Sequence, residues 1–311
     1  MAFITSIYVP STRALYNNAV IRSHEHAFEN RFDFQGKVEN SVKKIFLKSS
    51  VCLALAGMLL VNYLANALPI NDVTTGGVSD LYPNLFTPAG FTFSIWGFIY
   101  VLLLLFAFYQ LSPLAELKQK GGADALRLYF IFTCIANISW IFAWHHFRIL
   151  LSLVVIVILL VLLFRIAGIL DRAELTKAGS VFLRVPFSVY SGWITVASIA
   201  NLTVYLESIE WRGLQVPGDL WAAAAVLAGG AAAASRIIRR RDMAYGLVFI
   251  WAYAGILARH LSHEGFGGAY NLVIAAAIAG IAAVPVSIAV SLRRVKTGTG
   301  VNIKWPKAGY P

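Results

Sequence analysis

Residues 149–170 read ILLSLVVIVILLVLLFRIAGIL, an apolar run with a single charge at Arg165. A helix of about 20 such residues crosses the hydrocarbon core of a bilayer. The composition of the whole chain agrees, because 59% of its 311 residues are hydrophobic, only 13% are charged, and the mean hydropathy is +0.70. A soluble domain carries about 25% charged residues. The sequence therefore excludes a water-soluble enzyme and indicates an all-α, polytopic membrane protein.

Working outward from this run, similar apolar stretches predict eight transmembrane helices in total. Their approximate limits are 46–68, 91–112, 126–145, 149–170, 186–206, 218–235, 243–261 and 269–292. The sixth has the weakest hydropathy because it is mostly alanine, with Gly229 and Gly230 at its centre. The distribution of charge nevertheless supports this sixth span as a membrane crossing, because without it the basic run 236–241 would lie on the outer face.

Positive charge gathers on one side of the membrane under this assignment. If the N-terminus is cytoplasmic, all of the 26 Lys and Arg lie inside except Arg148, Arg212 and Arg259. Both termini are then cytoplasmic, and the net charge of +11 needs no nucleic-acid partner. Residues 1–45 are compatible with a cytosolic tail or an organelle presequence, because the first acidic residue is Glu25. The identity of the membrane stays open.

The fifth predicted span carries a polar and aromatic stripe. Tyr190, Trp193, Ala197 and Asn201 are spaced by 3, 4 and 4 residues, which places them on one face of a helix. A buried amide without a partner costs about 1–3 kcal/mol, so such a face is expected to contact protein, water or a ligand rather than lipid.

Two further spans repeat this pattern. The third carries Asn137, Trp140 and Trp144, and the second carries Phe93, Trp96 and Tyr100. Each set could serve as interhelical packing or as interfacial aromatic residues. If the three stripes converge, they form an apolar pocket with a few polar anchors, suited to a flat, lipophilic ligand. The long stretch 69–90 lacks Lys and Arg and is interpreted as a lid or binding loop, with a disordered connector as the alternative.

The motifs at these positions resemble the TspO/MBR family, the tryptophan-rich sensory proteins and translocator proteins. The run 87–100, TPAGFTFSIWGFIY, contains the W-x-x-x-Y of that family's second helix, and N-x-x-W and Y-x-x-W follow on the third and fifth helices. The resemblance covers residues 46–206. The sequence departs from the family pattern at Thr87, at Val189, and in having three spans beyond a five-helix bundle.

The resemblance implies a five-helix bundle at 46–206, followed by three additional helices at 207–292 and a basic cytosolic tail at 293–311. It also implies binding of a tetrapyrrole, a sterol-like molecule or another lipophilic ligand, for sensing, transport or disposal. A porphyrin or haem would be a ligand, and no cofactor, catalytic residue or metal site is implied. The residues that match the family's binding positions are Trp96, Tyr100, Asn137, Trp140, Tyr190, Trp193, Ala197 and Asn201.

Histidines near two span ends support the main alternative, a membrane-embedded haem or metal oxidoreductase. His145 ends the third span, and His260 and His263 lie one turn apart at the end of the seventh. A secondary transporter for small solutes is a third hypothesis, disfavoured because the chain lacks inverted halves and charged residues at mid-span. No nucleotide-binding or hydrolase motif is present, so the chain is not expected to be an enzyme. Besides membrane lipid and the lipophilic ligand, a second copy of the chain in a homodimer is left open as a partner.

Overall fold

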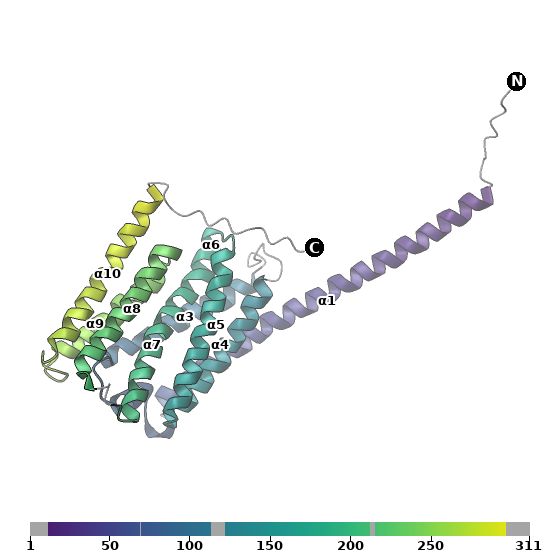
Figure 1. The fold of residues 1–311 in the computed structure, drawn as a ribbon. Helices are drawn as coiled ribbons and strands as arrows, with labels where there is room; N and C mark the ends of the chain where they lie inside the picture. The colour runs from purple at the N-terminus through teal and green to yellow at the C-terminus, as the bar shows by residue number, and fades with distance from the viewer. Residues whose placement is uncertain (1–11, 69, 113–121, 212–214, 297–311) are drawn as a thin grey trace. The chain divides into compact units, whose positions relative to one another are not determined.

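The computed structural model is helical wherever it has regular structure, and it describes residues 12–68, 70–112, 122–211 and 215–296 (Figure 1). The chain forms two compact units, Met1–Ser49 and Ser50–Pro311. The first unit holds the N-terminal part of α1 (Thr12–Ala67), and the other helices described here belong to the second unit.

Eight helices in the described ranges are long and apolar enough to cross a membrane, which confirms the predicted number of spans. They are Val38–Ala67 within α1, α3 (Ile95–Leu111), α4 (Gly122–His145), α5 (Ile149–Arg172), α7 (Val185–Ser208), α8 (Gly218–Arg240), α9 (Met243–Leu261) and α10 (Asn271–Lys296). The alanine-rich sixth span forms α8. Its C-cap is Arg241, which has a left-handed backbone conformation with a φ of 56°.

The stretch between α1 and α3 folds into short helical turns rather than an irregular connector. These are η1 (Ile70–Asp72), α2 (Thr75–Asp80) and η2 (Gly90–Ser94). The hydroxyl of Thr74 caps α2 by accepting a hydrogen bond from Gly77 N at 3.1 Å. Residues 70–94 are here termed the roof segment, because four of them border the cavity described below.

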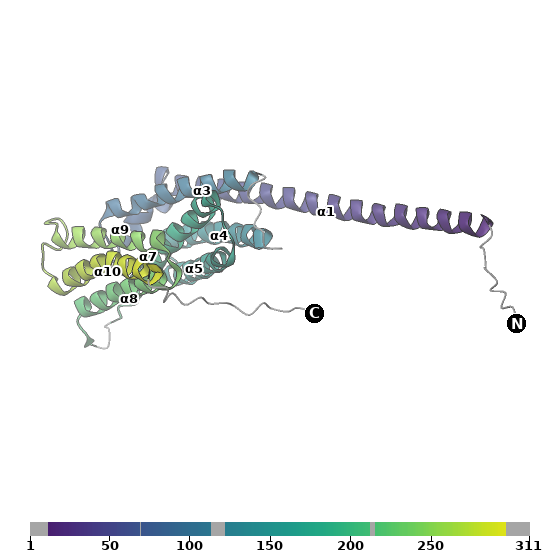
Figure 2. The same cartoon turned by 90° about the horizontal axis from the view of Figure 1, so that it is seen from above.

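Helix α7 occupies the centre of the second unit and packs against α3, α5, α8 and α9 (Figures 1 and 2). Its partner α5 packs in turn against α4, while α8, α9 and α10 pack against one another. Two short elements precede α7 directly, namely α6 (Lys177–Gly179) and the π-helical turn η4 (Ser180–Arg184). Pro186 lies in the first turn of α7, directly after the π-helical turn η4.

Small residues bring the C-terminal helices close together, as the ridges of alanine and glycine in the sequence suggest. A side chain at Gly229 of α8 or at Gly280 of α10 would collide with Tyr253 of α9. The Tyr253 hydroxyl donates to the Val226 carbonyl oxygen of α8 at 2.6 Å. One tyrosine therefore fits against the small residues of both neighbouring helices.

Candidate functional site

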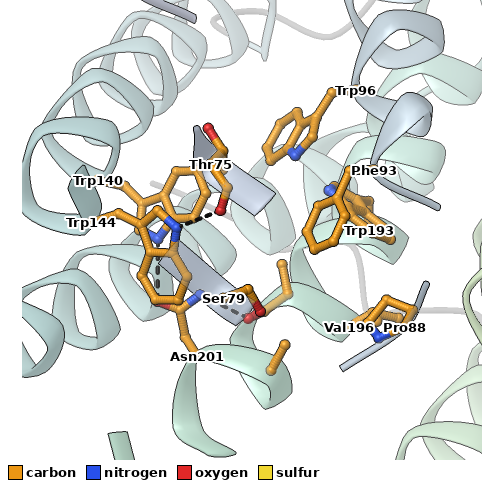
Figure 3. A pocket seen from close by; sticks show the side chains of 12 residues that line it. Thr75, Ser79, Pro88, Phe93, Trp96, Trp140, Trp144, Trp193, Val196 and Asn201 are labelled. Atoms are coloured by element: carbon orange, nitrogen blue, oxygen red, sulfur yellow. Dashed lines mark hydrogen bonds between the residues drawn. The ribbon is translucent and has the colours of Figure 1, made fainter. Parts of the chain in front are cut away.

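A cavity lies between α3, α4 and α7, beneath the roof segment (Figure 3). Its volume is about 30 Å³, which is room for about two water molecules. Most of its lining is aromatic or aliphatic and none of it carries a formal charge. The lining residues are Thr75, Ser79, Pro88, Phe93, Trp96, Trp140, Trp144, Trp193, Val196, Ala197, Ala200 and Asn201.

Indole rings from three helices meet at this cavity. Trp96 of α3 stacks on Trp140 of α4 with ring centroids 6.1 Å apart, and meets Trp193 of α7 edge to face at 6.3 Å. Phe93 makes a second edge-to-face contact with Trp193 at 6.1 Å. Trp144 extends the wall by stacking on Trp140 at 5.9 Å. The three predicted stripes therefore converge on one space within the bundle.

A network of amides and one phenol lies behind the indoles. Asn62 of α1 donates from Nδ2 to Asn137 Oδ1 at 2.7 Å, and Asn137 Nδ2 donates to the Tyr190 hydroxyl at 3.2 Å. Tyr190 contacts the edge of Trp96 at 6.0 Å, and Tyr100 stacks on the same indole at 5.8 Å. This network connects α1, α4 and α7 and supports the central indole from behind.

Asn201 joins the wall to the neighbouring helices. Its Oδ1 accepts hydrogen bonds from Trp140 Nε1 at 3.2 Å and from Ser152 Oγ of α5 at 3.1 Å. Its Nδ2 donates to the Ala197 carbonyl oxygen at 3.1 Å. Trp193 differs, because its buried Nε1 has no hydrogen-bond partner among the described residues. That indole N–H is therefore an unpaired donor inside the bundle, on a residue that lines the cavity.

The structure places the eight sequence-predicted residues in two layers. Trp96, Trp140, Trp193, Ala197 and Asn201 line the cavity. The other three belong to the supporting layer behind them, namely Tyr100, Asn137 and Tyr190.

The set of predicted binding residues did not include the contribution of the roof segment. Thr75, Ser79 and Pro88 border the cavity from that side. Their only signal in the sequence was the length of the 69–90 stretch and its lack of basic residues. Helical spacing would also have identified Ala200, which lies three residues after Ala197 on the same face of α7.

His145 of α4 contacts the roof segment through both of its ring nitrogens. Its Nδ1 lies 3.2 Å from the Ile70 carbonyl oxygen, which can only accept, so Nδ1 carries the proton. The other ring nitrogen, Nε2, then accepts from the Thr75 hydroxyl at 3.1 Å. The preceding residue, Trp144, donates from Nε1 to the Thr75 carbonyl oxygen at 2.9 Å.

The histidines of the oxidoreductase hypothesis are not gathered into a site. Both ring nitrogens of His145 are engaged by the roof segment, and His260 Nε2 donates to the Leu85 carbonyl oxygen at 2.9 Å. Within the part of the chain that the structure describes, no three His, Cys, Asp or Glu side chains lie close enough together to hold a metal ion.

A family model described as TSPO-like protein matches residues 48–290. The match includes α8, α9 and most of α10 as well as the helices around the cavity. Comparison with curated proteins and with solved structures gave no match. Eight apolar helices and this match identify an integral, multi-pass membrane protein. The chain belongs to the family of TSPO-like proteins.

Proposed function

We propose that this protein binds a flat, lipophilic ligand, such as a tetrapyrrole or a sterol-like molecule, in the cavity between α3, α4 and α7. Binding would serve the sensing, transport or disposal of that ligand. Membership of the TSPO-like family supports the proposal at the level of the whole chain. The single observation that carries it is the meeting of Trp96, Trp140 and Trp193 around one space.

Indoles on three sides suit a planar molecule better than a compact polar one. Aromatic faces and edges supply large contact areas with fixed geometry, and each such pair adds about 0.5–1.5 kcal/mol beyond the area it buries. The polar groups of the wall are mostly paired with one another, as Trp140 is with Asn201. The buried Trp193 Nε1 has no partner among the described residues and would donate to a carbonyl, ether or ring nitrogen of the ligand.

The neutral lining bears on how a tetrapyrrole would bind. A carboxylate placed against these residues would lose its hydration without gaining a cationic partner. The propionates of a porphyrin are therefore expected to lie outside the cavity, toward the membrane interface. Because the cavity has a volume of only about 30 Å³, the ligand also requires the roof segment or the indoles to move aside.

Titration with protoporphyrin IX tests the proposal. Binding to purified protein in detergent is followed by the visible absorption of the porphyrin, so that no removed indole serves as the reporter. Trp140→Ala and Trp193→Ala are each expected to weaken binding about tenfold, the loss of roughly 1.4 kcal/mol of aromatic contact. The control is Trp211→Ala, an exposed indole that pairs with Trp221.

Equal affinity in all four proteins would overturn the proposed site. Loss of binding in the Trp211 variant alone would point to the surface near the α7–α8 connection instead. The same series repeated with a neutral sterol distinguishes the ligand classes, since a sterol-selective cavity would retain that ligand and reject the porphyrin.

We further propose that both termini face the cytoplasm. The arginine run at the end of α8 lies on the side that the positive-inside rule assigns to that compartment. Two of its arginines form ion pairs with described residues. Arg236 pairs with Asp242 at 2.8 Å, and Arg240 lies 3.8 Å from Asp171.

A further inference from the structure

Helix α9 holds the roof segment on the side opposite to His145. The Ala89 N–H donates to the Gly255 carbonyl oxygen at 3.0 Å, and Trp251 Nε1 donates to the Thr92 carbonyl oxygen at 2.9 Å. These bonds join main-chain groups of the roof segment to α9, which lies outside the five-helix bundle predicted from the sequence. One of the three additional helices is therefore attached directly to the cover of the cavity.

The last turn of α9 adds a second set of contacts. His260 Nε2 donates to the Leu85 carbonyl oxygen at 2.9 Å. Arg259 Nη1 forms an ion pair with Asp80 Oδ1 at 3.0 Å and lies 3.5 Å from the Pro88 carbonyl oxygen. Residues 80–92 thus contact α9 at several successive points along its final three turns.

Gly255 permits the closest of these approaches. A Cβ at this position would collide with the Thr92 hydroxyl and would lie 2.9 Å from the Thr92 Cβ. Thr92 is fully buried, and its Oγ1 has no hydrogen-bond partner among the described residues. The threonine side chain therefore packs directly on the helix backbone at Gly255.

The residues fixed by α9 alternate with residues that border the cavity. Pro88 borders the cavity and directly precedes Ala89, while Phe93 borders it and directly follows Thr92. Any displacement of Ala89 and Thr92 from α9 therefore moves two cavity walls. Since the cavity is too small for a tetrapyrrole or a sterol as it stands, such a displacement is one movement that would enlarge it.

We propose that α9 is a latch for the roof of the cavity, with Trp251, Gly255 and Arg259 as positioning residues that act through residues 80–92. Release from α9 opens the cavity to ligand, while the contacts of Trp144 and His145 with Thr75 retain the other end of the segment. The role in ligand access rests on the function proposed above. The latch itself is a property of the fold and is tested without any ligand.

Hydrogen exchange followed by mass spectrometry tests the latch in purified protein. The Ala89 amide reports on it directly, because its acceptor is Gly255. In Gly255→Ala the new methyl group collides with Thr92 and displaces the roof segment from α9. Hydrogen exchange in residues 80–92 is therefore expected to rise about tenfold or more. Gly168→Ala of α5 is the control, since a Cβ there meets nothing within 4 Å. Adding Thr92→Ala to Gly255→Ala removes the colliding hydroxyl and methyl group but leaves the Thr92 Cβ 2.9 Å away, so it is expected to restore part of the protection.

A second variant tests the latch without adding a methyl group at Gly255. Arg259→Gln breaks the ion pair with Asp80, which is 61% exposed, and is expected to raise exchange in residues 80–92 about threefold. Arg148→Gln removes an exposed arginine at the same end of the bundle and is expected to change nothing. If Gly255→Ala loosens α8 to α10 as a whole, the Arg259 variant decides. Unchanged exchange in both variants would overturn the latch.

Stopped-flow mixing with protoporphyrin IX then connects the latch to the cavity. Association is expected to accelerate in Gly255→Ala by the same factor as the exchange, because both scale with the population of the open state. Faster exchange with an unchanged association rate would refute the role of the latch in access. Faster exchange in a protein that never binds porphyrin or sterol would leave the latch standing and reject the proposed function.

Discussion

Asn137 joins three helices through one side-chain amide. It accepts from Asn62 of α1 and donates to Tyr190 of α7, and its own side chain is fully buried in α4. Within a bilayer no water can replace a missing partner, so polar groups inside a bundle bond to one another. The amide therefore fixes how α1, α4 and α7 are rotated behind the indoles.

Removal of this amide is expected to weaken the bundle. Asn137→Ala should lower the free energy of unfolding by about 1–2 kcal/mol, since interhelical hydrogen bonds in membrane proteins contribute about 0.6 kcal/mol on average and up to about 1.7. Unfolding in a titration with sodium dodecyl sulfate measures the change. Ser139→Ala on the same helix is the control, because that exposed hydroxyl donates to the Ile135 carbonyl oxygen of its own helix. Equal losses in both variants would contradict the interhelical role.

The sequence predicted the direction of the cavity residues better than their depth. A spacing of 3 and 4 residues identifies one face of a helix, so Trp193, Ala197 and Asn201 were correctly grouped on one side of α7. Periodicity does not specify how far a side chain stands from the neighbouring helix. Tyr190 therefore shares the face of Trp193 but lies in the layer behind the cavity.

At the scale of the element, hydropathy predicted each long helix because the bilayer sets its length. The roof segment could not be predicted in the same way. Its turns, such as α2 (Thr75–Asp80), are too short to show a helical period, and their positions depend on tertiary contacts. Those contacts come from Trp144 and His145 on one side and from α9 on the other.

The close contact between α10 and α9 at Gly280 predicts that a larger residue there destabilises the packing of the two helices. Gly280→Ala introduces a methyl group against the Tyr253 ring and is expected to destabilise the protein by about 1–3 kcal/mol, the usual cost of overpacking. Gly168→Ala in α5, which has open space around it, is expected to be neutral or slightly stabilising. Thermal unfolding in detergent compares the two. A neutral Gly280→Ala would show that α10 does not pack tightly on α9.

At the scale of the molecule, the family match and the contacts agree on the C-terminal helices. The sequence offers no functional motif in these helices, whose centres carry no Asp, Glu, Lys, Arg or His. The match to the TSPO-like model extends to residue 290, and α9 packs against α7 as well as against the roof segment. Side-chain spacing within one helix does not reveal that distant contact, so it could not be read from the sequence.

Labelling of introduced cysteines tests the orientation of the whole chain. Ala178 and Ala269 are exposed residues at opposite ends of the bundle, in α6 and in the connection between α9 and α10. With cytoplasmic termini, a membrane-impermeant maleimide should label Ala269→Cys from the non-cytoplasmic side of sealed vesicles, and Ala178→Cys only after permeabilisation. The unsubstituted chain is the control, because Cys134 is buried and Cys52 is half-buried. Labelling of both from one side would contradict eight crossings.

The uncharged walls of the cavity have a thermodynamic consequence. Dissolved salt weakens attraction between exposed charges beyond a Debye length of about 8 Å. The residues that line the cavity carry no formal charge, so they make no ionic contact with a ligand that salt could weaken. Recognition should then be almost independent of ionic strength and should follow the octanol–water partitioning of each compound. For a compound whose carboxylic acid must enter the cavity, esterification would tighten the complex, the reverse of what a receptor built on arginine would do.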